Sequence, residues 1–240
     1  MSLSQDSLWG GRLTLWQPAR GHGYRYNLDP VLLAGFAAPA FHMVDLGAGC
    51  GVLGLLLLGM GKAQRVTAVE RQAQLCECAV KNAKDNGYDG VYRVVADDLR
   101  QLHEMTADAV VFNPPYYPAG SGQPSAHRGR DEGRHERHGT LKDFVVRAAA
   151  LLEGTGRCSA IVPVERGAEL EEQLAAVGLH VQRIRPIKPR VADPVAHVLL
   201  EAANKAQERV IEQPLIIHQG GSRQFTEEVR RWVEGPVSGS

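Results

Sequence analysis

The feature that most constrains the fold is an alternation between short apolar runs and stretches of helical periodicity, which begins at Met43 and continues through most of the chain. Strands that alternate with helices in this way form parallel sheets covered on both faces. We therefore predict an α/β fold with a doubly wound, mainly parallel sheet. The predicted strands are 43–46, 65–69, 91–96, 107–112, 157–162, 179–187, 197–203 and 210–218, and the predicted helices are 52–60, 72–86, 140–152, 165–177 and 226–233.

The first 42 residues precede this alternation. The part up to Asn27 is rich in glycine, aromatic residues and arginine, and residues 12–16 alternate in a way that permits a short edge hairpin. Asp29-Pro30 is typical of a helix start, and we predict a helix from there to near Pro39. A chain of 240 residues can bury one large core. We expect a single domain in which residues 1–42 form an N-terminal cap and helix over the ligand site and residues 43–240 form the core.

Charge and cysteine content narrow the function classes. The 27 basic and 27 acidic residues give no net charge, which disfavours a general nucleic-acid coat protein but permits a local basic contact. The sequence predicts neither a membrane span nor a signal peptide. The cysteines lack metal-ligand spacing, so we expect reduced thiols, no metal site and a cytoplasmic protein. These cysteines are Cys50, Cys76, Cys78 and Cys158.

Three glycines at alternate positions follow the strand predicted at 43–46. They are Gly47, Gly49 and Gly51, and glycines in such a turn allow a ligand to approach the backbone closely. A GxGxxG pattern is also present at Gly49, Gly51 and Gly54, so a dinucleotide site is an alternative. Asp45 argues against a pyrophosphate there, because a carboxylate repels phosphate and attracts an ammonium group.

Acidic residues follow the next two predicted strands. Glu70 ends one of them and is suited to a ribose diol. Asp97, Asp98 and Leu99 follow the other, where a carboxylate could meet an adenine amino group. The carboxyl ends of parallel strands share the sheet edge at which such folds bind ligands. Each acid alone is typical of a helix cap, but their joint position favours a nucleoside site.

The tetrapeptide Asn113-Pro114-Pro115-Tyr116 follows the buried strand predicted at 107–112. Both prolines lack a backbone N–H and restrict the residue before them, so they end the strand and hold Asn113 there. The Asn113 side-chain carbonyl, the Pro114 backbone carbonyl and the Tyr116 ring could then receive a planar group that bears an NH2. The alternative is an Asx turn before a stiff loop, and these four residues alone do not exclude it.

These motifs resemble those of class I S-adenosylmethionine-dependent methyltransferases. Residues 44–51 are similar to the cofactor motif, and residues 113–116 resemble the motif of members that methylate an exocyclic or amide nitrogen. More narrowly, the chain is similar to the bacterial tRNA1(Val) adenine N6-methyltransferases at residues 23–29, 32–34, 197–200, 215–218 and 225–226. The resemblance implies a seven-stranded, Rossmann-like fold, S-adenosylmethionine as the cofactor and an adenine beside the tRNA anticodon as the target.

The resemblance also implies roles for individual residues. Asp45 would anchor the methionine end of the cofactor, Glu70 would hold the ribose hydroxyls, and Asp98, or otherwise Asp97, would meet the adenine. Residues 26–29 would close over the cofactor. The residues predicted to bind the cofactor are Tyr26, Asn27, Asp29, Asp45, Gly47, Gly49, Glu70, Asp97, Asp98, Leu99 and Asn113, and the predicted catalytic residues are Asn113, Pro114, Pro115 and Tyr116.

A loop beyond the tetrapeptide, residues 126–138, carries four arginines and three histidines against three acids. Charge runs are most often solvated surface, but this position favours RNA binding by Arg128, Arg130 and Arg134. The loop is longer and more basic than the resemblance implies. A second basic stretch covers residues 183–190.

Other activities remain open from the sequence. The same pair of acceptors fits the amide NH2 of a protein glutamine, so a protein glutamine N5-methyltransferase is an alternative, as is a DNA adenine methyltransferase. A non-catalytic module that binds an adenosyl ligand or a dinucleotide is a further alternative, which the intact tetrapeptide 113–116 disfavours.

Overall fold

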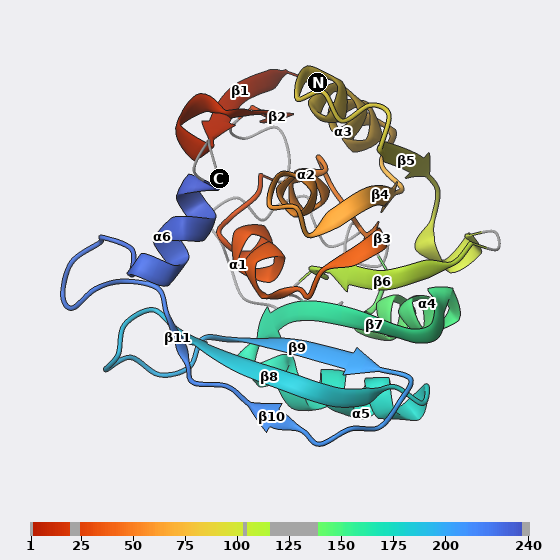
Figure 1. Ribbon diagram of the computed structural model, residues 1–240. Helices are drawn as coiled ribbons and strands as arrows, with labels where there is room; N and C mark the ends of the chain where they lie inside the picture. Colours follow the sequence, from red (N-terminus) through yellow and green to blue (C-terminus); the bar gives the residue numbers. More distant parts are fainter. Residues whose placement is uncertain (1, 20–24, 103–104, 116–138, 237–240) are drawn as a thin grey trace, which may run out of the picture.

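The computed structural model of the protein describes residues 2–19, 25–102, 105–115 and 139–236. A nine-stranded sheet runs through these ranges in the order β10-β8-β9-β7-β6-β3-β4-β5, with β11 also paired to β8 (Figure 1). Its strands are β3 (Ala40–Leu46), β4 (Ala63–Glu70), β5 (Tyr92–Ala96), β6 (Ala107–Phe112), β7 (Leu152–Pro163), β8 (His180–Lys188), β9 (His197–Ala203), β10 (Val210–Ile211) and β11 (Leu215–Ile216).

The predicted doubly wound, mainly parallel sheet is confirmed, with two corrections. The described residues form nine strands and not the seven that the resemblance implies, because β10 and β11 add short pairings to β8 at one side of the sheet. Strand β9 is antiparallel to β7 and β8, and the other strand pairs of the sheet are parallel. The single strand predicted at 210–218 is wrong. Two strands of two residues each, β10 and β11, lie there instead. Pro214 stands between them and has no N–H to donate to β8, so one continuous strand cannot form.

Strand side chains alternate between two hydrophobic cores, one on each face of the sheet. Met43 and Val111 join the core to which α1, α2, α3 and α6 contribute. Val44 and Phe112 join the core of α4 and α5. This period of two explains why the central strands are apolar throughout. The helices are α1 (Asp29–Phe36), α2 (Val52–Gly59), α3 (Ala73–Asp85), α4 (Leu141–Leu151), α5 (Gly167–Ala176) and α6 (Glu227–Glu234).

Local sequence explains where individual helices begin. Thr140 caps α4, because its side chain accepts a hydrogen bond from the Asp143 N–H while the Asp143 carboxylate accepts from the Thr140 N–H at 2.7 Å. Helix α2 is apolar on nearly every side because it lies against both α1 and the sheet (Figure 1). Among the described residues, no helix is both long enough and apolar enough to cross a membrane.

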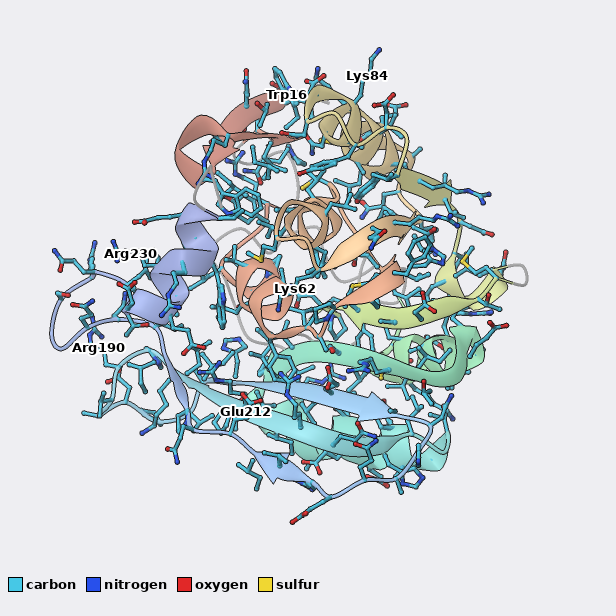
Figure 2. All side chains as sticks on the ribbon, viewed as in Figure 1. Trp16, Lys62, Lys84, Arg190, Glu212 and Arg230 are labelled. Atoms are coloured by element: carbon cyan, nitrogen blue, oxygen red, sulfur yellow. The ribbon has the colours of Figure 1, made fainter. Side chains whose placement is uncertain are left out.

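The N-terminal segment forms a hairpin, as the sequence permitted. Strands β1 (Leu3–Leu8) and β2 (Leu13–Pro18) are antiparallel, with Leu8 paired to Leu13. Figure 2 shows Trp16 of this hairpin and Lys84 of α3 at the same end of the molecule. The helix predicted from Asp29 begins there and ends at Phe36, three residues before Pro39.

Strands β3, β4, β5, β6 and β7 all end at one edge of the sheet, which we call the carboxyl edge. The register aligns Leu46 with Val69 on one side and with Phe112 on the other, and aligns Glu70 with Ala96. The polar residues that follow these strands therefore lie next to one another.

Candidate active site

The carboxyl edge brings together most of the residues that the sequence singled out. Asp45, Gly47 and Gly49 come from β3 and the turn after it, Glu70 ends β4, and Asn113 follows β6. Because β3 lies between β4 and β6, its turn is flanked by the polar ends of both neighbours. Among the described residues, no group of three or more His, Cys, Asp or Glu side chains is arranged to hold a metal ion.

Asp45 has the most unusual electrostatic environment at this edge. Its side chain is buried, and its Oδ2 atom has no hydrogen-bond partner among the described residues. Burial raises the pKa of Asp45 from 3.8 to about 7. The negative charge of Glu70 adds to this rise, and a hydrogen bond from the Gly54 backbone opposes it. A buried carboxylate oxygen without a partner is costly, so this position suits a cation or an N–H donor on a ligand.

The glycines of the turn have two different functions. Gly47 and Gly49 have φ values of 71° and 58°, which side chains rarely adopt, and a Cβ on Gly49 would meet nothing within 4 Å. A Cβ on Gly51 or Gly54 would instead lie 2.5 to 2.7 Å from the Tyr92 side chain. The last two glycines of the GxGxxG pattern therefore allow helix α2 to pack on the sheet, and Gly49 leaves open space at the turn.

The Glu70 carboxylate fixes this turn relative to α3. Its Oε2 accepts a hydrogen bond from the Gly49 N–H at 2.9 Å, and its Oε1 accepts from the Arg71 and Gln72 N–H groups at 2.9 and 2.8 Å. The sequence predicts a ribose contact for Glu70, and that role stays a prediction. The bond to Gly49 was not predicted, because it depends on the register between β3 and β4.

The two acids after β5 have different surroundings. Asp98 accepts from Arg100 at 2.6 Å and from Arg71 at 3.1 Å, and the hydrogen bond from Arg100 holds its pKa well below the usual range. The Oδ1 atom of Asp97 accepts from the Asp98 N–H at 2.7 Å. The buried Leu99 follows and packs into the core of α4 and α5. Both acids thus lie at the carboxyl edge, and their contact with an adenine remains a prediction.

Asn113, Pro114 and Pro115 follow β6 directly, as the sequence predicted. Asn113 is half-buried, Pro114 is buried and Pro115 is exposed. The Arg166 side chain donates to the Pro115 carbonyl at 3.3 Å and also binds both carboxylate oxygens of Glu169 at 3.0 Å. Nothing in the sequence pattern points to Arg166, because 51 residues separate it from Pro115. The predicted catalytic residue Tyr116 lies outside the described residues.

The segment before α1 carries the residues predicted to cover the cofactor. Tyr26 is half-buried, and burial raises its pKa, with the negative charge of the nearby Asp6 adding to the effect. The Cys50 thiol also lies near Tyr26. Asn27 donates to the Asp29 carboxylate at 2.5 Å, and its Oδ1 atom accepts from the Asp29 N–H at 3.1 Å. Since Cys50 belongs to the glycine turn, this segment lies beside the turn.

The structure describes the second of the two basic stretches but not the three arginines of the first. Arg128, Arg130 and Arg134 lie outside the described residues, so their RNA contact stays a prediction. In the second stretch, Arg183 binds Glu201 at 3.2 Å, and Arg185 binds Glu228 at 2.6 Å. These two arginines of β8 thus have carboxylate partners within the fold, so this stretch is not a run of free cations.

Known proteins are similar to this chain in sequence and in fold. The methyltransferase small domain family matches residues 29–177. The tRNA1(Val) (adenine(37)-N6)-methyltransferase of Vibrio campbellii is 27% identical over 215 residues, which are 88% of this chain and 89% of that protein. The protein of the same name from Pedobacter heparinus is 30% identical over 162 residues, covering 66% of this chain and 68% of that one.

A solved structure has the same architecture. The crystal structure of a predicted O-methyltransferase from Agrobacterium tumefaciens superposes with a TM-score of 0.68 at 24% sequence identity, and the match covers 85% of this chain and 94% of that one. At this level of identity the similarity shows a common fold.

Proposed function

Since this chain belongs to the methyltransferase small domain family, we propose that it transfers a methyl group from S-adenosylmethionine to the N6 amino group of an adenine in tRNA, beside the anticodon at position 37. The name shared by its relatives supports this substrate. The observation that carries the proposal is the placement of Asn113 and Pro114 next to the glycine turn, because Leu46 and Phe112 are paired where β3 and β6 end.

The residues of the turn fit S-adenosylmethionine. Asp45 has a buried oxygen without a described partner, which suits the ammonium group of the methionine end. The open space at Gly49 lets a ligand lie against the backbone. In this proposal Glu70 accepts from the ribose hydroxyls, and Asp98 or Asp97 accepts from the adenine amino group. When bound, the cofactor supplies a methyl group on a positively charged sulfur.

Asn113 and Pro114 act on the target nitrogen in this proposal. The lone pair of an adenine amino group is delocalised into the ring, so the nitrogen is a poor nucleophile. Two N–H groups that donate to the Asn113 side chain and the Pro114 carbonyl would favour a tetrahedral nitrogen with a free lone pair. The N–H proton becomes acidic once the nitrogen carries the methyl group, so no strong base is needed. The main role of these residues is then to hold the nitrogen in line with the methyl group.

Substrate binding completes the proposal. Tyr116 would stack on the flipped adenine, a contact worth about 1 to 3 kcal/mol. Arg128, Arg130 and Arg134 would bind RNA phosphates, so affinity should fall steeply with salt. The N-terminal cap, residues 1–42, would cover the cofactor through Tyr26 and the residues that follow it.

The test uses tritiated S-adenosylmethionine with tRNA, rRNA, DNA and protein in separate reactions, followed by nucleoside analysis. We expect label in tRNA, as N6-methyladenosine, and no label with the Asn113→Ala variant. Label only in protein would support glutamine methylation instead, and label only in DNA would support a DNA adenine methyltransferase. Binding of the cofactor without transfer to any of the four would favour a non-catalytic module.

A further inference from the structure

Asn82 of α3 and Asn86, which caps the C-terminus of this helix, bind the edge of strand β2 that is not paired to β1. Asn86 accepts from the Thr14 N–H at 2.8 Å and donates to the Thr14 carbonyl at 2.7 Å. Asn82 accepts from the Trp16 N–H at 2.6 Å and donates to the Trp16 carbonyl at 2.8 Å. Four residues rise about 6 Å along a helix, and two residues rise about 6.6 Å along a strand. The spacing of the two amide side chains therefore matches the spacing of the backbone groups on β2, and they bind β2 as the backbone of a neighbouring strand would.

Asn82 makes a further contact that Asn86 does not share. Its amide nitrogen also donates to the Cys50 carbonyl at 2.8 Å, and its side chain is fully buried. Cys50 stands between Gly49 and Gly51 in the glycine turn. One buried side chain thus contacts both the hairpin and the turn.

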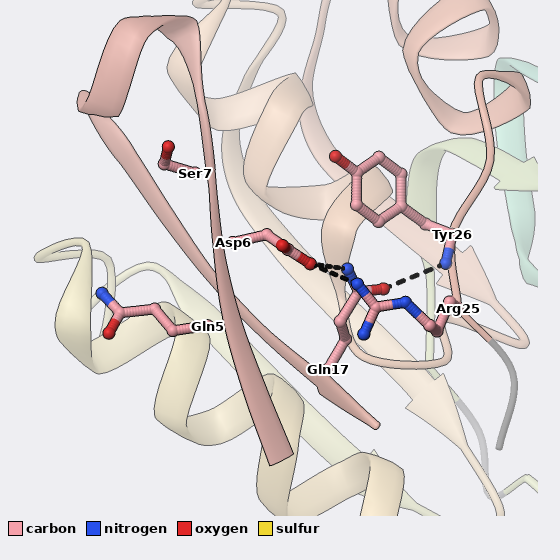
Figure 3. A pocket seen from close by; sticks show the side chains of 6 residues that line it. All are labelled: Gln5, Asp6, Ser7, Gln17, Arg25 and Tyr26. Atoms are coloured by element: carbon pink, nitrogen blue, oxygen red, sulfur yellow. Dashed lines mark hydrogen bonds and ion pairs between the residues drawn. The ribbon is translucent and has the colours of Figure 1, made fainter. Parts of the chain in front are cut away.

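The other side of the hairpin holds the segment that precedes α1 (Figure 3). The buried Gln17 side chain accepts from the Tyr26 N–H at 3.3 Å and donates to Asp6. Arg25 donates to the same Asp6 carboxylate and to the Pro18 carbonyl, the latter at 2.7 Å. The hairpin therefore holds the start of residues 26–29, which are predicted to close over the cofactor.

We propose that Asn82 is a positioning residue for S-adenosylmethionine, which fixes the distance between the glycine turn and the N-terminal cap. This inference rests on the proposed function, since it concerns the same cofactor. Without the Asn82 amide, the Cys50 carbonyl loses its buried donor, and the hairpin loses the connection to the turn that runs through Asn82. Both walls of the cofactor site would then be less well defined, and the ligand would have to order them on binding.

The experiment compares Asn82→Ala with Asn86→Ala in the full chain. Asn86 is a matched control, because it makes the same pair of bonds to β2 but does not contact the turn. Isothermal titration calorimetry with S-adenosylhomocysteine measures affinity, and thermal unfolding measures stability. We expect both variants to unfold at lower temperature. The dissociation constant should rise about tenfold or more for Asn82→Ala, and less than about threefold for Asn86→Ala.

The outcomes separate the inference from the proposed function. Equal rises for the two variants would contradict the inference, because a loosened hairpin alone would explain them. An unchanged dissociation constant for Asn82→Ala would also contradict it while leaving the proposed function intact. If the unaltered protein binds neither S-adenosylhomocysteine nor S-adenosylmethionine, the proposed function itself is wrong.

A measurement on the unaltered protein covers the case in which Asn82→Ala does not fold. Hydrogen exchange of the Trp16 and Thr14 amides reports their bonds to Asn82 and Asn86. Saturating S-adenosylhomocysteine should slow exchange at Trp16 about tenfold more than at Thr14, because only Asn82 contacts the turn. Equal slowing at both amides, or none at Trp16, would contradict the inference.

Discussion

Two buried carboxylates of the central sheet have opposite surroundings. Glu201 on β9 is 3% exposed and accepts from Arg183 at 3.2 Å and from Ser159 at 3.4 Å. Asp45 on β3 is 2% exposed, and its Oδ2 atom has no partner among the described residues. A buried charge that is already paired serves the fold, whereas one left without a cation is available to a ligand. The β8–β9 flank is thus a structural region, and the carboxyl edge is the candidate functional region.

The largest expected effect is that of Asn113→Ala at the carboxyl edge. Loss of one acceptor that acts on the target nitrogen should lower kcat about 1000-fold. The dissociation constant for S-adenosylmethionine should change less than about threefold, because the proposed role of Asn113 is at the target base. Single-turnover methyl transfer and calorimetry measure the two quantities. Parallel loss of turnover and cofactor affinity would show that Asn113 mainly supports the cofactor.

Asp45→Asn should weaken cofactor binding while stabilising the free protein. Removal of the charge should raise the dissociation constant for S-adenosylmethionine about 30-fold, the usual worth of a hydrogen bond to a charged group. Calorimetry at pH 8 measures this, with Glu201→Gln as the control expected to bind normally. Unchanged affinity in Asp45→Asn would show that the unpaired Asp45 oxygen does not bind the cofactor.

The pH dependence of stability tests the same residue. The folded-state pKa of Asp45 is raised to about 7 from 3.8, so the unfolded chain ionises first and stability falls as pH rises between these values. Asp45→Asn abolishes this loss. The variant should therefore exceed the parent in free energy of unfolding by on the order of 2 to 4 kcal/mol at pH 8 and by little at pH 4. Urea denaturation at both pH values measures the difference, and equal differences would contradict the raised pKa.

On the structural flank, Glu201→Gln should destabilise the protein by about 2 kcal/mol. The change leaves Arg183 without one buried partner, although Arg183 keeps Glu212 at 2.7 Å and is itself partly exposed. Urea denaturation measures the loss. A variant as stable as the parent would show that Glu201 contributes no more than an exposed acid.

The smallest expected effect is at an exposed ion pair of the same flank. Arg209 binds Glu171 at 2.7 Å, but their side chains are 46% and 32% exposed. Arg209→Ala should change the free energy of unfolding by less than about 0.5 kcal/mol, because solvent screens the pair. The same denaturation series measures it. A loss equal to that of Glu201→Gln would mean that burial does not distinguish the two pairs.

The sequence by itself determined the order and type of the main elements. Apolar runs of strand length alternate with helical patterns, and prolines and glycines mark their ends. Local periodicity is therefore enough to predict these elements. It also placed Asp45, Glu70 and Asn113 at one edge, because the carboxyl ends of parallel strands must coincide. The prediction of one strand at 210–218 was wrong because Pro214 separates the apolar residues 210–211 from 215–217.

Only the tertiary structure decided which polar groups have partners. The sequence could not show that Glu70 holds the Gly49 N–H, that Arg166 contacts the Pro115 carbonyl, or that Asn82 joins the hairpin to the turn. These bonds join residues that are 21 to 66 positions apart in the chain. Their existence depends on strand register and helix packing, which no local pattern encodes. For the same physical reason, only the folded chain shows that the Asp45 Oδ2 atom has no partner among the described residues.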